Sequence, residues 1–416
     1  MTKKIDTIIV GLGLAGLAYA EHLLNSGKSF VVFSNRSQQA SMVAGGLYNP
    51  VILKRFTGAW NGAAQLDYAL PFYENLERKL GLKLDYQLPI LRRFASIEEQ
   101  NLWFQASDKP DLNSFLSLKL LENNNQGLSI PHKFGLVQGS GRVATKALIN
   151  SYETYLEQQD LWRNESFDCT HLSVEVSGVS YKSWKAKRVV FAEGYGLKSN
   201  PFFNYLPLEG TKGEVITMRI PGLNEGAIVK SGVFIIPLGG DLYRVGSTYF
   251  WRDKTEGPTE AAKTFLLERL ERFMTLPYEI VSHMSGVRPT VSDRRPLVGQ
   301  HPEHNNLFVL NGMGSRGVMT APTAANTGTG ADYKVILTTG GEEVTADTDC
   351  AVNITGLTNP SSSGLPAYTV KVNDKVLILL PTKTNKLLLQ WKGPYEIVEK
   401  LSDVNYRISM GKREKV

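Results

Sequence analysis

A short glycine-rich segment near the start of the chain constrains its fold more than any other feature. The stretch TIIVGLGLAGLAYAEHLLNSG, residues 7–27, passes from an apolar run through Gly11, Gly13 and Gly16 into a pattern typical of an amphipathic helix. In such a strand–turn–helix unit, the first glycine permits a tight turn, the second lets a pyrophosphate approach the backbone, and the third lets the helix pack on the strand. The helix N-terminus adds N–H donors and a positive dipole. The segment predicts a dinucleotide-binding turn, the alternative being a glycine-rich turn without a ligand.

The end of the next expected strand leaves the identity of the dinucleotide open. NAD and FAD sites usually carry an acidic residue there, which binds the ribose hydroxyls. This chain instead has VVFSNRS, with Ser34, Asn35 and Arg36. Ser34 or Asn35 can hydrogen-bond a ribose, whereas an arginine without a neighbouring acid also suits the phosphate of NADP. The segment alone does not choose between FAD and NADP.

Composition divides the 416 residues into three regions. Residues 1–326 alternate apolar strand-like runs with helix-periodic runs, the pattern of a layered α/β protein. Residues 327–369 are rich in Thr, Gly and Ser, carry five acidic residues against one lysine, and include a linker-like NPSSSG. Residues 370–416 carry ten Lys or Arg against five acidic residues, and their short apolar runs predict strands.

Cysteine usage and hydropathy indicate a cytoplasmic protein. Cys169 and Cys350 lie far apart, so they supply no disulfide framework or paired metal ligands. The N-terminal apolar run is too short for a signal peptide, and no segment approaches the roughly 20 apolar residues that span a bilayer. We therefore expect no membrane partner. The net charge of +6 is mild for this length and does not by itself imply nucleic acid.

Three further stretches resemble the FAD-dependent amino-acid and amine oxidases related to D-amino-acid oxidase, glycine oxidase and sarcosine oxidase. Residues 40–56, ASMVAGGLYNPVILKRF, resemble the family's second flavin-contacting loop, and residues 188–196, RVVFAEGYG, resemble its strand-and-glycine motif. Residues 286–322, GVRPTVSDRRPLVGQHPEHNNLFVLNGMGSRGVMTAP, resemble its C-terminal signature. The resemblance covers most of residues 1–326. It implies an FAD-dependent oxidoreductase that moves hydride from a small amine or amino acid to flavin N5.

The resemblance also implies which residues form the site. Arg288 matches the position whose guanidinium binds a substrate carboxylate, a role suited to its bidentate geometry; the alternative is a structural ion pair with Asp293 or another nearby acid. The turn GMGSRGV and a helix starting near Thr320 are expected to direct backbone N–H groups at the flavin. The implied catalytic residues are Arg288, Gly314 and Arg316. The implied cofactor-binding residues are Gly11, Gly13, Gly16, Ser34, Asn35, Ala44, Gly45, Gly46, Ala192, Gly194, Gly312, Gly314, Gly317 and Val318.

The expected fold is α/β: a Rossmann-like FAD-binding domain with an inserted α+β substrate domain, followed by a small β-barrel-like C-terminal segment. The expected boundaries are 1–58, 135–205 and 285–326 for the FAD-binding domain, 59–134 and 206–284 for the substrate domain, 327–369 for an unassigned acidic β-rich segment with a linker, and 370–416 for the basic β module. Residues 212–220, 232–240 and 242–251 predict antiparallel strands of the substrate domain. Their aromatic residues Tyr243, Tyr249 and Trp251 are pocket candidates, although aromatic residues on strands more often pack.

The histidines give no metal or catalytic signal. His301, Glu303 and His304 in QHPEH have metal-ligand chemistry, but the proline and the loop position favour a solvated turn, so we expect no metal. The other four histidines lack a partner at ligand or triad spacing and are expected at the surface or in the core: His22, His132, His171 and His283. Lys54 and Arg55 either approach the flavin or face solvent.

The tail resembles a different family. Residues 370–408 resemble the C-terminal module of gypsy-like retroelement integrases, which carries a Gly-Pro-Tyr motif, here at 393–395. Its lysines favour weak nucleic-acid binding, the alternative being a solvated basic surface. After Asn326 the sequence TGTGADYK predicts that the last helix stops after about two turns, whereas the family continues into a long helix. We therefore expect a composite chain with an impaired oxidase part.

Two other functions stay open at this level. One is a nucleic-acid-binding or chromatin-binding fusion protein with a vestigial oxidase part. The other is a flavoenzyme that acts on a modified tRNA base.

Overall fold

The computed structural model describes residues 2–327, 375–381, 389–400, 406–409 and 414–415. The chain divides into two compact units, Met1–Gly341 and Glu342–Val416. Apart from Thr327, the predicted acidic segment and its linker lie outside the described residues.

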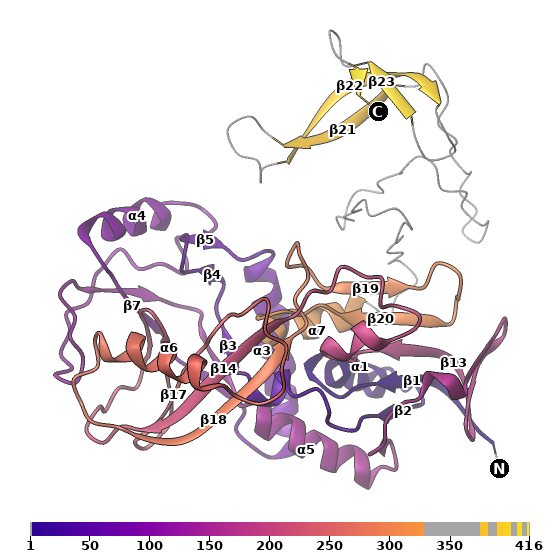
Figure 1. The fold of residues 1–416 in the computed structure, drawn as a ribbon, viewed down its shortest axis with the longest axis horizontal. Helices are drawn as coiled ribbons and strands as arrows, with labels where there is room; N and C mark the ends of the chain where they lie inside the picture. The colour runs from indigo at the N-terminus through magenta and orange to yellow at the C-terminus, as the bar shows by residue number, and fades with distance from the viewer. Residues whose placement is uncertain (1, 328–374, 382–388, 401–405, 410–413, 416) are drawn as a thin grey trace. The chain divides into compact units, whose positions relative to one another are not determined.

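The first unit contains an eight-stranded sheet with a parallel centre (Figure 1). Its central strands follow the order β10-β2-β1-β13-β20, and each pair of neighbours is parallel. These strands are β10 (Trp162–Arg163), β2 (Phe30–Phe33), β1 (Lys3–Val10), β13 (Trp184–Phe191) and β20 (Leu307–Asn311). Antiparallel strands extend the sheet, namely β11 (Leu172–Glu175), β12 (Gly178–Tyr181) and β19 (Leu297–Gln300). The parallel centre agrees with the expected Rossmann-like domain.

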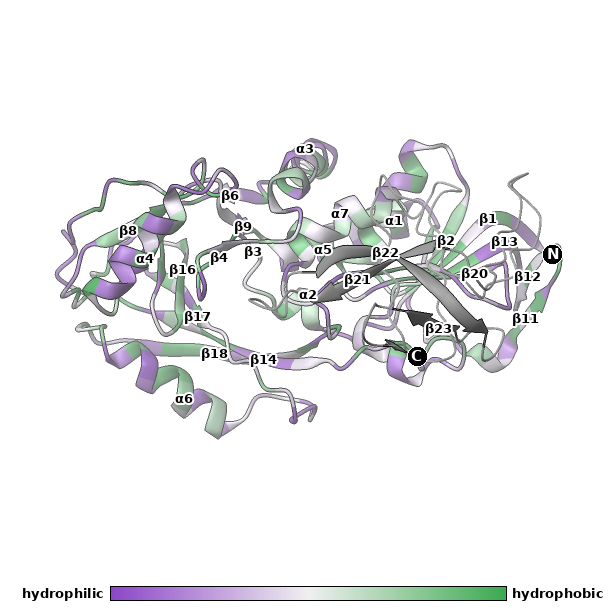
Figure 2. Cartoon of the chain, turned by 90° about the horizontal axis from the view of Figure 1, so that it is seen from above, coloured by the Kyte–Doolittle hydropathy of each residue, from purple (hydrophilic) through white to green (hydrophobic). Residues whose placement is uncertain are grey.

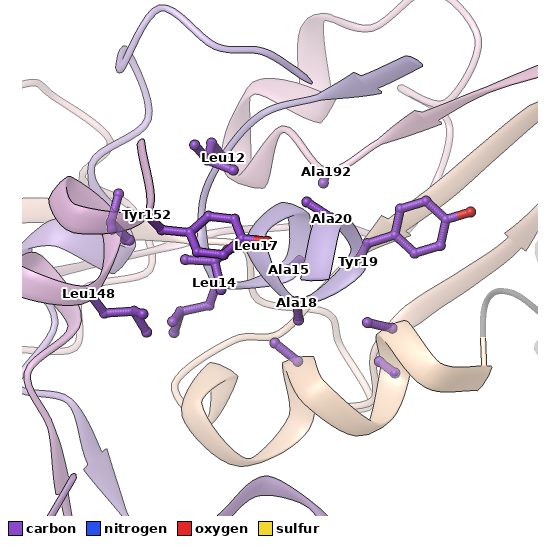
Figure 3. Packing of buried hydrophobic residues seen from close by; sticks show 14 of the residues in the cluster. Leu12, Leu14, Ala15, Leu17, Ala18, Tyr19, Ala20, Leu148, Tyr152 and Ala192 are labelled. Atoms are coloured by element: carbon purple, nitrogen blue, oxygen red, sulfur yellow. The ribbon is translucent and has the colours of Figure 1, made fainter. Parts of the chain in front are cut away.

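Helices bury one face of this sheet in the main hydrophobic core. Helix α1 (Leu14–Asn25) is rich in Ala and Leu, which favour helix, and most of its residues are buried. It packs against α7 (Gly317–Thr327), and Figure 3 shows Ala18 directed at α7. Small residues on both helices permit this close packing, because α7 contributes Ala321 and Ala324 to the same cluster. Helices α3 (Gly62–Leu80) and α5 (Thr145–Gln158) complete this layer.

A second, seven-stranded sheet runs in the order β18-β14-β17-β16-β15-β7-β8. Its strands are β7 (Ile90–Arg93), β8 (Phe134–Val137), β14 (Thr211–Arg219), β15 (Ile228–Lys230), β16 (Phe234–Gly239), β17 (Leu242–Gly246) and β18 (Glu279–Arg288). Strands β14, β16 and β17 correspond to the three predicted strands, and their antiparallel pairing confirms that prediction. Short strands β3 (Leu47–Tyr48), β6 (Asp85–Gln87) and β9 (Gly141–Val143) form a separate sheet, and β4 (Val51–Ile52) pairs with β5 (Thr57–Gly58).

Two helices accompany the second sheet, and Figure 2 shows each with both hydrophilic and hydrophobic residues. Helix α4 (Ile97–Ser107) is capped by Ser96, whose Oγ accepts from Glu99 N, while Glu99 Oε2 accepts from Ala95 N, just before the cap. Helix α6 (Glu260–Glu271) begins at Thr259, whose Oγ1 accepts from Ala262 N. Leu266 and Leu270 of α6 are buried in the same cluster as residues of β14 and β17.

The predicted domain boundaries remain a prediction, and the two sheets can be compared with them. The eight-stranded sheet uses strands between residues 3 and 33, 162 and 191, and 297 and 311. The seven-stranded sheet uses strands between residues 90 and 137 and between 211 and 288. Strand β8 and the end of β18 belong to the second sheet, a few residues across the boundaries expected at 135 and 285.

The second unit contains a four-stranded antiparallel sheet in the order β21-β22-β23-β24. Its strands are β21 (Lys375–Pro381), β22 (Leu389–Lys400), β23 (Tyr406–Ser409) and β24 (Glu414–Lys415). The tail is therefore β-structured as expected, but its described strands form an open sheet and not a closed barrel. In the described part of the whole chain, no helix has the length and apolar character required to cross a bilayer.

A buried cluster of charges lies within the second sheet. Lys212 and Glu214 on β14 are completely buried, with Lys212 Nζ 3.0 Å from Asp253 Oδ2 and 3.6 Å from Glu214 Oε1. Glu214 Oε2 accepts from Thr259 N at 2.8 Å, and His283 Nε2 lies 3.0 Å from the same oxygen. His283 therefore lies next to a buried carboxylate, although its Nε2 makes no hydrogen bond within the described residues. The sequence did not reveal this neighbour because strand pairing brings the two residues together. The cluster ties β14 and β18 to the loop that precedes α6.

Replacing Lys212 with methionine should lower the free energy of unfolding by about 3 kcal/mol, because Glu214 would stay buried after losing its cation. Chemical denaturation measures this change. The matched control is Lys133→Met, which removes an ion pair whose side chains are 50% and 68% exposed and should cost less than ~1 kcal/mol. Equal effects of the two substitutions would show that the buried cluster does not stabilise the sheet.

Candidate active site

The strand order of the eight-stranded sheet reverses between β1 and β13, which are parallel neighbours. In doubly wound sheets, ligands bind at the carboxyl ends of the two strands where the order reverses. The turn after β1 begins at Gly11, whose N–H donates to Phe33 O at 2.8 Å, while Ala192 N after β13 donates to Val10 O at 2.7 Å. A cavity of about 800 Å³ opens here and continues to the second sheet.

The three glycines of the first turn have three different roles. Gly11 has φ +96°, and a Cβ there would lie 2.5 Å from Ala192 O, so a side chain would push the two strand ends apart. A Cβ on Gly16 would lie 2.0 Å from Gly11 O, so Gly16 lets α1 pack on the turn and does not line the cavity. A Cβ on Gly13 would meet only Ser41 Oγ, at 3.2 Å, and would otherwise project where the cavity is open.

The N-terminus of α1 is suited to bind an anion. Its first turn contains no acidic residue, and Leu14 N donates to Ser41 Oγ at 3.2 Å. The remaining N–H groups of the first turn precede the intrahelical ladder and carry the positive end of the helix dipole. This is the arrangement expected for a pyrophosphate.

The residues after β2 favour FAD over NADP. Ser34, Asn35 and Arg36 all line the cavity. Arg36 forms a bidentate pair with Glu153, so its charge is already neutralised within the protein and is poorly suited to a ribose phosphate. Asn35 Nδ2 donates to Ser166 Oγ at 2.8 Å, so its amide is already engaged within the protein. Ser34 is therefore the better candidate to hydrogen-bond the ribose.

The predicted second loop also reaches the cavity through Ala44, Gly45 and Gly46. Gly46 has φ +72°, its carbonyl accepts from Val143 N at 2.9 Å, and a Cβ there would lie 1.9 Å from Val143 O. Ala44 O accepts from Arg244 Nη1 at 2.9 Å, so the loop is fixed to the second sheet.

The turn after β20 departs from the prediction in its hydrogen bonding. Gly194, Gly314 and Gly317 line the cavity, but Gly312 packs under Val291 and does not. Gly314 N donates to Pro289 O at 2.9 Å, so this N–H is engaged within the protein and is not directed at a ligand. Helix α7 begins at Gly317, three residues before the expected start.

The N–H groups available to a flavin on this side are accordingly those of the first turn of α7, at Gly317 and Val318.

Arg288 projects an incompletely paired guanidinium into the cavity. Its Nη2 donates to Ser247 Oγ at 2.8 Å and to Thr248 O at 3.2 Å, while Nη1 is buried without a partner. No acid of the described residues lies within 4.0 Å of it, and Asp293 accepts from Arg295 N instead, so the structural ion pair is not formed. Burial lowers the pKa of Arg288, because desolvation disfavours its charged form. An anionic ligand group would offset that cost.

Arg316 presents a second guanidinium of the same kind. It lines the cavity, its Nη1 is buried without a partner, and burial lowers its pKa. Two buried cations with free donors indicate that the ligands of this cavity carry negative charge.

Several other candidates lie outside the cavity lining. Tyr243 is buried in the core of the second sheet and its hydroxyl accepts from Glu225 N at 3.1 Å. Tyr249 and Trp251 also do not line the cavity, whereas Lys54 does and its neighbour Arg55 does not.

The QHPEH segment is a turn, but the prediction that it is solvated was wrong for its first histidine. His301 is only 8% exposed, because its ring packs edge-on against Phe203 and stacks on His304. Its Nδ1 accepts from Glu303 N and His304 N, which is a structural role. No group of three or more His, Cys, Asp or Glu side chains in the described ranges is arranged to hold a metal ion.

The cavity also contains residues that the sequence did not predict as site residues, among them Ser41, Glu193, Lys230 and Arg244. Glu193 lies between Ala192 and Gly194 in the predicted glycine motif, so its position was a usable signal. Burial raises the pKa of Glu193 to about 7, although its carboxylate accepts from Asn200 Nδ2 at 2.7 Å. Lys230 and Arg244 carry no local signal, because only the pairing of distant strands brings them to the cavity.

The doubly wound sheet and the anion-binding cavity at its switch point define a dinucleotide-binding protein. The family model of FAD dependent oxidoreductases, DAO, matches residues 6–329, and the chain belongs to this family. The cavity fits the cofactor, because a Cβ at Gly13 would project into it and its buried guanidiniums lack anionic partners. The model of the integrase p58 C-terminal domain matches residues 393–416, in agreement with the resemblance of the tail.

Known proteins support the assignment at the level of the family. Glycine oxidase from Bacillus licheniformis is 22% identical over 77% of this chain and 91% of its own length. The glycine oxidase of Geobacillus kaustophilus is 30% identical in an alignment that covers 27% of this chain and 30% of its own length. A crystal structure of glycine oxidase from the same organism superposes on this chain with a TM-score of 0.65 and 20% sequence identity, and the superposition covers 78% of this chain and 93% of that chain. A third relative is the tRNA 5-methylaminomethyl-2-thiouridine biosynthesis bifunctional protein MnmC of Burkholderia pseudomallei, which is 24% identical over 78% of this chain. This chain spans only 55% of the length of that protein.

Replacing Gly13 with alanine should weaken FAD binding about tenfold or more, because the added methyl occupies space next to the pyrophosphate-binding turn. The fold should tolerate it, since Gly13 has φ −78°. Fluorescence titration of the flavin-free protein with FAD measures the affinity, and denaturation measures the stability. Gly226→Ala is the control, because a Cβ there meets no atom within 4 Å. Unchanged FAD affinity in Gly13→Ala would contradict the placement of the pyrophosphate.

Replacing Glu193 with glutamine should stabilise the protein at pH 8 and much less at pH 5. The pKa of Glu193 in the folded state, about 7, exceeds its ordinary value of 4.5. Above pH 4.5 the carboxyl therefore ionises more readily in the unfolded chain, and the resulting cost to the stability of the folded protein grows until about pH 7. The gain at pH 8 should be about 2–3 kcal/mol relative to pH 5. Denaturation of both proteins at the two pH values checks this. A gain independent of pH would show that Glu193 is ionised throughout.

Proposed function

We propose that this FAD-dependent oxidoreductase oxidises a small amine or amino acid that carries a carboxylate. The observation that carries the proposal is Arg288, a guanidinium held by Ser247 and Thr248 with its Nη1 buried and unpaired at the cavity. A planar guanidinium with free donors is suited to a carboxylate, which it binds through two parallel hydrogen bonds. The glycine oxidases similar to this chain support the same substrate class.

The residues that would hold FAD are drawn from four segments. Gly11 and Gly13 with the start of α1 would receive the pyrophosphate, and Ser34 the ribose. Residues 44–46 and the start of α7 line the cavity farther along, where the flavin ring would lie. When bound, FAD supplies the acceptor for a hydride from the carbon beside the substrate nitrogen. The positive end of the α7 dipole would stabilise negative charge at that end of the cavity.

The acidic residues of the cavity are engaged within the protein. Glu153 pairs with Arg36, Glu165 pairs with Lys182, and Glu193 accepts from Asn200. None of the three is free to act as a general base. The chain therefore contributes binding, orientation and exclusion of water, and the substrate amine would react in its neutral form.

An exposed cation–aromatic cluster favours a second candidate, a flavoenzyme acting on a modified tRNA base. The guanidinium of Arg294 lies 5.3 Å from the ring of Tyr249 and 4.8 Å from the ring of Trp251, which is 40% exposed. The guanidinium of Arg288 lies 5.2 Å from the same Tyr249 ring, so the cluster borders the carboxylate site. Exposed aromatic and arginine side chains are the usual platform for unpaired bases. The similarity to MnmC adds support.

The tail does not add to either candidate. Its family match and its described strands give no observation that supports nucleic-acid binding, and the hypothesis of a nucleic-acid-binding fusion protein gains nothing from them.

The purified protein should be yellow, and its flavin spectrum should bleach anaerobically with a suitable amino acid. Arg288→Ala should lower kcat/KM at least about 30-fold, because the substrate carboxylate would lose a buried charged partner. Arg55→Ala is the control, since Arg55 is exposed and outside the cavity.

Reduction by a tRNA-borne secondary amine, but by no free amine, would favour the second candidate. A folded protein that binds no flavin would contradict both.

A further inference from the structure

Lys230 lies in a row of residues that forms one wall of the cavity. Strand pairing aligns Met284, Val215, Gly246, Phe234 and Lys230 across β18, β14, β17, β16 and β15. All five line the cavity. Paired residues of neighbouring strands point to the same face of a sheet, so Lys230 is on the cavity side. It is the last member of the row that lines the cavity, because its next partner, Arg92 of β7, does not.

Lys230 has no anionic partner among the described residues, none of whose acids lies within 4.0 Å of its ammonium. Its Nζ lies 4.4 Å from the centre of the Phe234 ring. Burial lowers the pKa of Lys230 to about 8, with further lowering by Arg92 of β7 and Arg269 of α6. Arg92 pairs with Glu99 of α4 and uses that carboxylate itself. This end of the cavity therefore holds excess positive charge.

Of the other cations that line the cavity, Arg316 also has an unpaired donor, but it belongs to the turn between β20 and α7 and not to the second sheet. Others are less available for a substrate. Arg244 donates to Ala44 O through Nη1, and Lys54 belongs to an exposed loop. Arg288 stands on β18, at the opposite edge of the row from Lys230 on β15. Four strand spacings separate the backbones of these two strands, a distance on the order of 19 Å. The two long side chains bridge only part of this distance. A ligand as small as glycine cannot contact both cations.

We propose that Lys230 binds a second anionic group of the substrate, so that the preferred substrates are amino acids with a second carboxylate several bonds from the first. This inference rests on the proposed function, in which Arg288 binds the first carboxylate. Lys230 is then a specificity-determining residue, and Phe234 lies between the two anion sites.

The test compares α-amino dicarboxylates of increasing length, namely aspartate, glutamate, 2-aminoadipate and 2-aminopimelate, with monocarboxylates of equal chain length. The measured quantity is the ratio of kcat/KM within each pair, for the full-length protein with bound FAD. We expect a preference for the dicarboxylate that increases with length. Lys230→Met should reduce it roughly tenfold or more, Lys230→Arg should retain most of it, and kcat/KM for the monocarboxylates should change little.

The control variant is Lys133→Met, because Lys133 is half exposed and pairs with Glu122 outside the cavity lining. An independent readout is the perturbation of the oxidised flavin spectrum by glutarate, adipate and pimelate, which bind without turnover. Their dissociation constants should rise in Lys230→Met and not in Lys133→Met.

An equal drop in kcat/KM for the dicarboxylate and the monocarboxylate of each pair in Lys230→Met would overturn the inference, and so would loss of bound FAD. In either case Lys230 would support the cofactor or the fold. No dicarboxylate preference in the wild-type protein would overturn it as well. Failure of every amine to reduce the flavin would instead contradict the proposed function. The binding of the non-oxidisable dicarboxylates would still decide the role of Lys230.

Discussion

The site depends on the close contact between two backbone segments, the turn after β1 and the end of β13. Gly11 approaches the carbonyl of Ala192 so closely that a Cβ would lie 2.5 Å from it, and Gly16 approaches the carbonyl of Gly11 in the same way. These contacts bring the start of α1 to the switch point of the sheet, where its first residues line the cavity. Without them, the helix dipole and the carboxyl ends of the strands would not converge on one ligand.

The second sheet contributes a wall of fixed cations to the same cavity. The guanidinium of Arg288 is positioned by Ser247 and Thr248, and Glu214 N donates to Thr248 Oγ1 at 2.9 Å. The buried pair of Lys212 and Glu214 is therefore linked through Thr248 to the loop that positions Arg288. Charges that are satisfied on the far side of the sheet stabilise the structure, whereas those left unsatisfied on the cavity side provide binding energy for anionic ligands.

Much of the fold was predictable, because its signals are local. The run through Gly11 and Gly13, the apolar strands and the three antiparallel strands after residue 211 all follow from periodicity and turn chemistry. The resemblance then led to Ala192, Arg288 and Arg316, which the structure places at the same cavity. Sequence patterns did less well where a role depends on an unseen neighbour. Gly16 and Gly312 pack the backbone and do not line the cavity, and His301 is buried by aromatic residues from a distant segment.

The sequence by itself determined the dinucleotide-binding turn, the α/β class and the family, since these depend on glycine spacing and on residues adjacent in the chain. The tertiary structure alone decided which charges are free. It paired Arg36 with Glu153, left Arg288 without an acid, and brought Lys230 to the cavity across five strands. The physical reason is that the availability of a charge depends on burial and on partners within a few ångströms, and strand pairing sets both between residues far apart in sequence.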